Sequence, residues 1–187
     1  MRGARLAGLS LVLIACGGPT DPPAPPPEAA SPTGAAVTEA QAPAPEGLTP
    51  AAAETYRRLK AAADAGDAAA LIAIAAESPG FAFTFGPEAD FAEYIASAEM
   101  RGRDPVGELA AILAMPPGET TLDGVRVYHW PSFYDWEASR YTAETRADAA
   151  RIVGEEAAAQ ITDDLAYLGP RAGIDENGQW LFYVTGD

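Results

Sequence analysis

The sequence is short of the residues that carry most enzyme chemistry. Its 187 residues include one cysteine, Cys16, and one histidine, His129. A single cysteine cannot form an internal disulfide, and this pair cannot build a His-rich zinc site or a Cys–His nucleophile. The nucleophile-elbow, zinc-protease, P-loop, dinucleotide-binding and paired C-x-x-C patterns are also missing from the sequence. We therefore expect no metal and no cofactor.

Basic residues are scarce as well. The chain has 12 Lys and Arg against 27 Asp and Glu, a net charge of −15, and residues 51–187 have 10 against 23, a net charge of −13. Such a charge repels phosphate backbones, and no basic stripe offers the counterion release on which nucleic-acid binding depends. We expect no nucleic-acid partner. The acidic residues also fit a well-hydrated surface with no specific role.

The chain also lacks a long hydrophobic run. Arg2 and Arg5 precede a ten-residue run from Leu6 to Ala15, about half of the roughly 20 residues that span a bilayer as a helix. This arrangement is typical of an export signal that is removed, here residues 1–15. The end of the hydrophobic run and the next residue read Leu13-Ile14-Ala15-Cys16, and Gly17 follows the cysteine.

This motif resembles the lipobox of bacterial lipoprotein signal peptides. The resemblance implies that the Cys16 thiol is joined to diacylglycerol and that its freed amino group receives a fatty acyl chain such as palmitate. An ordinary secretory signal that ends at a chance cysteine is the alternative. Several acyl chains at one point give stable attachment to a lipid bilayer. We expect a lipid-anchored protein of the cell envelope, with the outer membrane favoured by Gly17.

Proline dominates the segment after the cysteine. Residues 17–50 hold ten prolines and eight alanines, so we interpret residues 16–50 as a lipidated cysteine followed by a linker without a fold of its own. In extended polyproline geometry, at about 3.1 Å per residue, 34 residues reach on the order of 100 Å. Docking of a partner to P-x-x-P segments is the functional alternative to a spacer.

Residues 51–187 have the size of one domain, and their patterns predict an α+β fold. Apolar spacing predicts a helical hairpin over 50–78 and helices from Pro87, from Asp104 and over 142–168. Alternation predicts strands over 81–85, 125–130, 171–174 and 179–185, the last two joined by an Asn-Gly turn. We expect a small antiparallel sheet of about four strands packed against several helices. The closing D-E-N-G-Q-W-L-F-Y-V-T-G-D is similar to the ends of uncharacterised exported bacterial proteins, which implies no activity.

The stretch V-Y-H-W-P-S-F-Y-D-W, residues 127–136, is the best candidate site because it holds five aromatic rings within ten positions. Two or three of these rings are expected in the core, and the others are expected on the surface beside carboxylates. Exposed tyrosine and tryptophan are typical of interfaces. The candidate residues for contact with an envelope protein or a glycan are Tyr128, Trp130, Phe133, Tyr134 and Trp136.

A catalytic alternative centres on His129. Asp135 or Glu137 can orient its imidazole if the loop after the strand folds back, as in a small hydrolase or isomerase. The structural interpretation is a strand-end histidine that bonds a backbone carbonyl. Asp175 and Asn177 resemble calcium ligands but fit a tight turn equally, and we assign no ion. Our leading hypothesis is a non-catalytic, tethered binding module, and a plain spacer lipoprotein is the third possibility.

Overall fold

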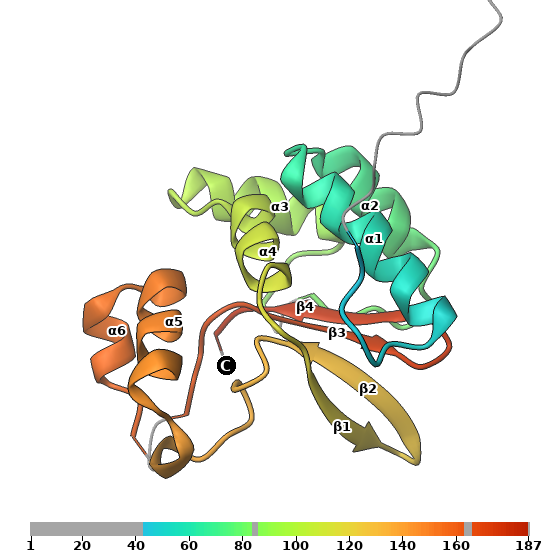
Figure 1. The fold of residues 1–187 in the computed structure, drawn as a ribbon. Helices are drawn as coiled ribbons and strands as arrows, with labels where there is room; N and C mark the ends of the chain where they lie inside the picture. The colour runs from blue at the N-terminus through green and yellow to red at the C-terminus, as the bar shows by residue number, and fades with distance from the viewer. Residues whose placement is uncertain (1–42, 84–85, 163–165, 187) are drawn as a thin grey trace, which may run out of the picture. The chain divides into compact units, whose positions relative to one another are not determined.

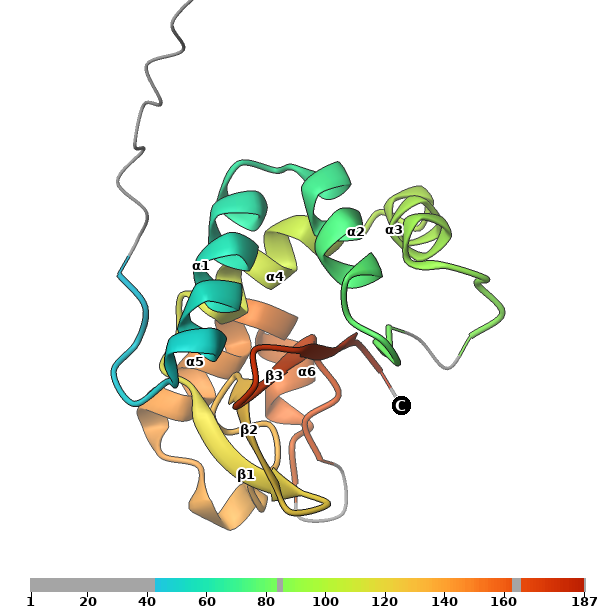
Figure 2. The same ribbon diagram turned by 90° about the vertical axis from the view of Figure 1, so that its right-hand side faces the viewer.

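A computed structural model describes residues 43–83, 86–162 and 166–186 of the chain. These residues form an α+β domain, as the sequence predicts: helices α1–α4 cover one face of an antiparallel sheet, and α5 and α6 lie beside it (Figure 1). The view turned by 90° shows α1–α4 again on one side of the sheet (Figure 2). The helices are α1 (Pro50–Asp64), α2 (Ala68–Ala76), α3 (Phe91–Met100), α4 (Pro105–Leu113), the short 3-10 helix η1 (Ala138–Arg140), α5 (Ala143–Val153) and α6 (Glu155–Ala159).

Side-chain caps fix where helices α1–α5 begin. In each, an oxygen of the residue before the helix accepts a backbone N–H of the first turn, which satisfies a donor that has no partner inside the helix. Thr49, Asp67 and Thr142 supply these caps for α1, α2 and α5. The helix expected to begin at Pro87 begins instead at Phe91, because the Asp90 side chain caps it by accepting from Glu93 N at 2.8 Å.

The apolar stripes predicted for the first four helices are buried. All of the stripe residues except Ala98 belong to the larger of two hydrophobic cores, which lies between these helices and the sheet. The confirmed stripe residues are Ala52, Tyr56, Leu59, Ala63, Leu71, Ile74, Ala75, Phe91, Tyr94, Ile95, Ala98, Val106, Leu109, Ile112 and Leu113.

The prediction of a single long helix over residues 142–168 is wrong. Gly154 has φ +86°, a conformation that favours glycine, and it ends α5 and separates it from α6. The chain leaves helical geometry after Ala159. Ile161 is buried as expected, but Leu168 is 41% exposed, and Leu165 lies outside the described residues. A smaller second core surrounds α5 and α6.

The sheet is a simple antiparallel meander in the order β1-β2-β3-β4. Its first strand was not expected from the sequence, and its first hairpin turns at Asp123 and Gly124, both with positive φ, as the tightest hairpin turns require. In the described part of the segment expected as a strand, residues 81–83, the chain makes one isolated bridge, from Ala82 to Phe182, while Thr84 and Phe85 lie outside the described residues. The strands are β1 (Gly118–Leu122), β2 (Val125–Trp130), β3 (Arg171–Asp175) and β4 (Trp180–Val184).

A bulge in β4 changes which side chains share a face. Gly173 pairs with Phe182 and Ile174 pairs with Trp180, so Leu181 has no partner residue. The extra residue shifts the alternation. Trp180 and Tyr183 therefore both lie in the core beneath the helices, whereas strict alternation predicted opposite faces.

The last hairpin is bonded to the first helix. The Thr49 hydroxyl donates to the carbonyl of Glu176 at 2.6 Å, and the Thr55 hydroxyl donates to that of Gly178 at 2.6 Å. Ala44 and Leu48 also pack against the larger core. The folded domain therefore begins before residue 51, inside the range that the sequence assigned to the linker.

Candidate functional site

Three of the five candidate aromatic rings lie inside the protein. Tyr128 is 1% exposed, Trp130 0% and Phe133 3%. Trp130 stacks on Tyr56 of α1, with ring centroids 5.5 Å apart, and Phe133 belongs to the second core. The prediction that two or three rings are core residues is confirmed. These three side chains cannot contact a partner directly.

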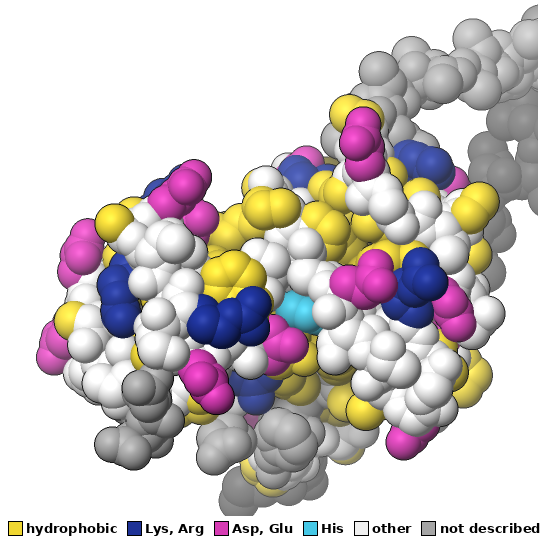
Figure 3. Space-filling view, turned by 60° about the horizontal axis from the view of Figure 1, so that its bottom comes forward, with side chains coloured by type: hydrophobic (Ala, Val, Ile, Leu, Met, Phe, Trp, Pro, Cys, Tyr) yellow, Lys and Arg dark blue, Asp and Glu magenta, His cyan; other side chains and the backbone are white. Residues whose placement is uncertain are grey.

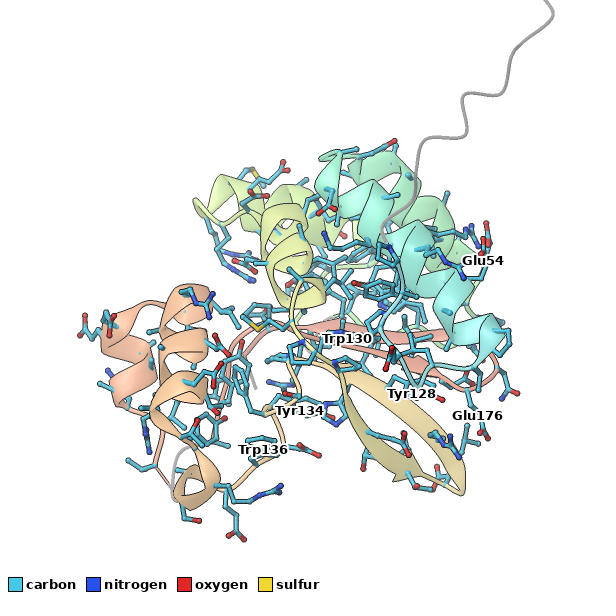
Figure 4. The ribbon with its side chains drawn as sticks, in the orientation of Figure 1. Glu54, Tyr128, Trp130, Tyr134, Trp136 and Glu176 are labelled. Atoms are coloured by element: carbon cyan, nitrogen blue, oxygen red, sulfur yellow. The ribbon has the colours of Figure 1, made fainter. Side chains whose placement is uncertain are left out.

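The two remaining rings, Tyr134 and Trp136, are half-buried and lie on the side of the sheet away from α1–α4 (Figure 4). The Arg140 guanidinium lies 4.6 Å from the centroid of the Trp136 ring, a cation–π contact. Asp135 and Glu137 are exposed beside the rings. We call these five residues, Tyr134, Asp135, Trp136, Glu137 and Arg140, the 134–140 surface.

His129 holds the loop that carries this surface. Its Nδ1 lies 3.3 Å from the carbonyl oxygen of Pro131, and its Nε2 lies 3.7 Å from an Asp135 oxygen. The edge of Tyr134 meets the imidazole, with ring centroids 4.6 Å apart. Both ring nitrogens therefore face the residues that follow His129 in the chain, which matches the structural interpretation of a histidine bonded to a backbone carbonyl.

Glycines in the neighbouring strands make room for the imidazole. Gly118 and Gly173 are the residues paired with His129 in β1 and β3. A Cβ on Gly118 would lie 2.2 Å from the imidazole, and a Cβ on Gly173 would lie 2.4 Å from the ring of Phe182. The two rings thus lie over glycines, and Tyr134 contacts both rings.

Burial lowers the pKa of His129, although the charge of Asp135 and the bond to Pro131 partly oppose this shift. The histidine side chain is only 1% exposed. Figure 3 shows the face that carries it, with the histidine in cyan beside acidic and basic side chains. The structure brings His129 and Asp135 together, while no contact links Glu137 to His129 in the part of the chain described.

The turn at Asp175 has a structural explanation. One carboxylate oxygen accepts the backbone N–H groups of Asn177 at 2.9 Å and Gln179 at 2.8 Å. Asx turns use aspartate in this way. Across residues 43–83, 86–162 and 166–186, no group of three or more His, Cys, Asp or Glu side chains is placed to share a metal ion.

Sequence reasoning missed a cavity of about 350 Å³ between α4, α5 and α6. Its polar end holds Arg103, whose Nε donates to Glu108 Oε1 at 3.1 Å and whose Nη2 donates to Thr185 Oγ1 at 2.9 Å. Burial opposes the charge on Arg103, but Glu108 outweighs it and raises the pKa of Arg103 above its usual range. Burial, reinforced by the charge of Glu108, also raises the pKa of Tyr183.

The expected lipid attachment point, Cys16, lies outside the described residues. Among the helices that the structure does describe, none combines the length and the apolar character needed to cross a bilayer.

Comparison with known proteins gives no relative. No family model, curated protein or solved structure matches the chain.

Proposed function

We propose that the protein is a lipid-anchored envelope lipoprotein whose domain binds a protein partner through the 134–140 surface. The observation that carries this proposal is that Tyr134 and Trp136 stay half-exposed while their neighbours fix them in place. Tyr134 contacts His129 and Phe182, and Arg140 lies over Trp136. Rings that are already ordered lose little conformational freedom when a partner covers them, which favours binding.

The surroundings of Trp136 favour a protein over a glycan. Stacking on a sugar needs an open ring face, but Arg140 covers one face of Trp136 and Tyr141 approaches the indole nearly perpendicularly, at 86° and 6.3 Å. Tryptophan, tyrosine and arginine are the residues enriched at the energetic centres of protein interfaces. A partner with a basic rim suits the net charge of −13 over residues 51–187.

The catalytic alternative has weaker support. A general base needs a nitrogen that a substrate proton can reach. Nδ1 of His129 faces the Pro131 carbonyl, Nε2 faces Asp135, and the side chain is 1% exposed. Neither nitrogen is therefore open to a substrate.

The anchor and the linker complete the proposal. Lipidation at Cys16 fixes the chain to the membrane, and the proline-rich segment up to the start of the folded domain at Ala44 gives the domain a reach of about 80 Å at about 3.1 Å per residue. The 134–140 surface can then meet partners that are not themselves at the membrane.

The test is in-cell photo-crosslinking with the full lipoprotein. A benzophenone amino acid replaces Trp136 in one strain and Met100, which is 83% exposed on α3, in the control strain. We expect a discrete protein adduct from position 136 only, with a lower yield when Arg140→Glu is added.

An adduct from both positions would indicate nonspecific contact, and no adduct from position 136 would leave the spacer role. Capture of a glycan instead of a protein would contradict the choice of partner. Each of these results refutes the proposed function.

A further inference from the structure

The cavity of about 350 Å³ lies at the seam between the two hydrophobic cores, and its lining residues do not include any residue of the 134–140 surface. Ile152 of α5 lines it and packs against both cores. Ligand pockets are frequent where two packed units meet, and typical volumes run from about 300 to 1,000 Å³. At roughly 30 Å³ for each liquid water molecule, this cavity equals the space of about a dozen waters.

Most of the cavity wall is apolar. It comes from α5, α6 and the segment before β3, and it includes Leu168, which is 41% exposed although its neighbour Tyr167 is buried. A large aliphatic side chain left open to solvent at the rim of a cavity favours an apolar guest, since covering it removes hydrophobic surface from water. The apolar wall residues are Ile152, Val153, Ala157, Ile161, Ala166 and Leu168.

The opposite end is polar but internally neutral. Arg103 forms a two-point ion pair with Glu108, and the same carboxylate lies 3.2 Å from the Tyr183 hydroxyl. Neither charge needs a ligand to balance it. An anion would have to compete with Glu108 for Arg103, and it would do so inside a strongly acidic domain. A cation would have to compete for Glu108 with Arg103 and the Tyr183 hydroxyl, which already donate to this carboxylate.

Two uncharged groups that line the cavity remain able to bind a ligand. The Thr185 hydroxyl accepts from Arg103 and keeps its own proton for another acceptor. The side-chain amide of Gln160, which also lines the cavity, makes no hydrogen bond to any residue in the described ranges.

We propose that this cavity binds an uncharged, mainly apolar small molecule of about a dozen non-hydrogen atoms that carries one hydrogen-bonding group. Its apolar body lies against Ile152, Ile161 and Leu168, and its polar group lies at Thr185 or Gln160. This site is independent of the partner surface and of the lipid anchor.

The test uses three molecules that share a body and differ in the charge of the head group: 4-phenylbutan-1-ol, 4-phenylbutanoate and 4-phenylbutylammonium. Each is titrated into the full chain carrying Cys16→Ser, and the backbone amide resonances are followed by NMR. We expect the alcohol to shift the resonances of Gln160, Leu168 and Thr185 saturably. We expect it to bind at least 5-fold more tightly than either charged molecule.

Two substitutions locate the site. Ala157→Trp fills the cavity from an exposed helix position and should weaken binding of the alcohol at least 10-fold, whereas Ala159→Trp on the same helix should leave it unchanged. Leu168→Glu, at an exposed rim position, should weaken it as well. Shifts that do not saturate, tighter binding of a charged molecule, or binding unaffected by Ala157→Trp and Leu168→Glu would overturn the proposal.

Discussion

Removal of the His129 side chain tests whether this residue holds the loop that carries the 134–140 surface. His129→Ala deletes a ring that is 1% exposed and leaves an empty space over Gly118. Large-to-small changes in a core cost about 2–5 kcal/mol, and the loss of a partner for a buried carbonyl costs about 1–3 kcal/mol. We expect the free energy of unfolding to fall by about 3–5 kcal/mol, a large part of the typical 5–15 kcal/mol.

His129→Asn is the matched variant, because its amide nitrogen can replace Nδ1 opposite the Pro131 carbonyl at 3.3 Å. It should recover about 1 kcal/mol of the loss, since a typical hydrogen bond contributes this much. The assay is urea unfolding followed by tryptophan fluorescence. Equal stability of His129→Ala and the wild type would refute the role of His129 in holding this loop.

The wild type and His129→Asn also test how stability depends on pH, and the direction of the expected change is fixed. The pKa of His129 is lowered in the folded state, so below its unfolded value of about 6.5 the unfolded chain binds more protons than the folded chain. The wild type therefore loses stability as the pH falls below about 6.5, and the loss ends below the folded pKa. Between pH 6.5 and 5.5 this loss is at most about 1.4 kcal/mol.

His129→Asn has no group that titrates at this position, so its stability difference from the wild type should shrink over the same pH window. Asp135, which faces the imidazole, favours the protonated form and limits the effect. A difference that stays constant, or that grows as the pH falls, would show that the histidine is not buried in its neutral form.

Three further predictions concern the turn, the aromatic rings and the anchor. Gly178→Ala should lower the free energy of unfolding by about 2–4 kcal/mol in urea unfolding, because φ is +86° and the new Cβ would lie 2.7 Å from a carbonyl oxygen of α1. Gly124→Ala is the control, since φ there is +83° but the space around it is open, and it should cost about 1–2 kcal/mol. Equal costs would exclude the close contact as the cause. Trp130→Ala should cost about 3–5 kcal/mol, since this ring is 0% exposed, and Trp136→Ala, which truncates a half-buried ring, should cost about 1 kcal/mol in the same assay; the reverse order would contradict the assignment of core and surface. Cys16→Ser should abolish incorporation of radiolabelled palmitate and release the protein from the membrane fraction, and continued labelling would place the lipid elsewhere.

The helices could be predicted because their signals are local. A cap such as Asp104 and the apolar spacing after it lie within a single turn or two, so α4 could be read directly from the chain. The same logic failed after Thr142, where an apolar spacing continued past Gly154 although the backbone there has positive φ. Gly154 therefore ends α5, and the spacing of apolar residues does not reveal this end.

Strand β1 shows why the sheet was harder to predict. Gly118–Leu122 is an edge strand with polar, exposed residues, so it lacks the apolar alternation that marks β2. The Asp123-Gly124 turn is the signal that could have identified it. The bulge in β4 left no sequence signal, because it depends on the pairing with β3.

The candidate site was predictable only in part. The contact between His129 and Asp135 was expected on the condition that the loop folds back, and five residues of chain lie between the pair. The cavity was not predictable, because Glu108, Ile152 and Thr185 are far apart in the chain and only tertiary packing brings them together.

If the proposed lipid anchor holds the chain, the Thr49 hydroxyl has a mechanical consequence. It links the start of the first helix to the carbonyl of Glu176, 127 residues further along, next to the turn that closes the final hairpin. A pull that arrives through the preceding chain is therefore shared with the last hairpin of the sheet at once. Peeling away the first helix therefore requires breaking this bond and the bond from Thr55 to Gly178 as well.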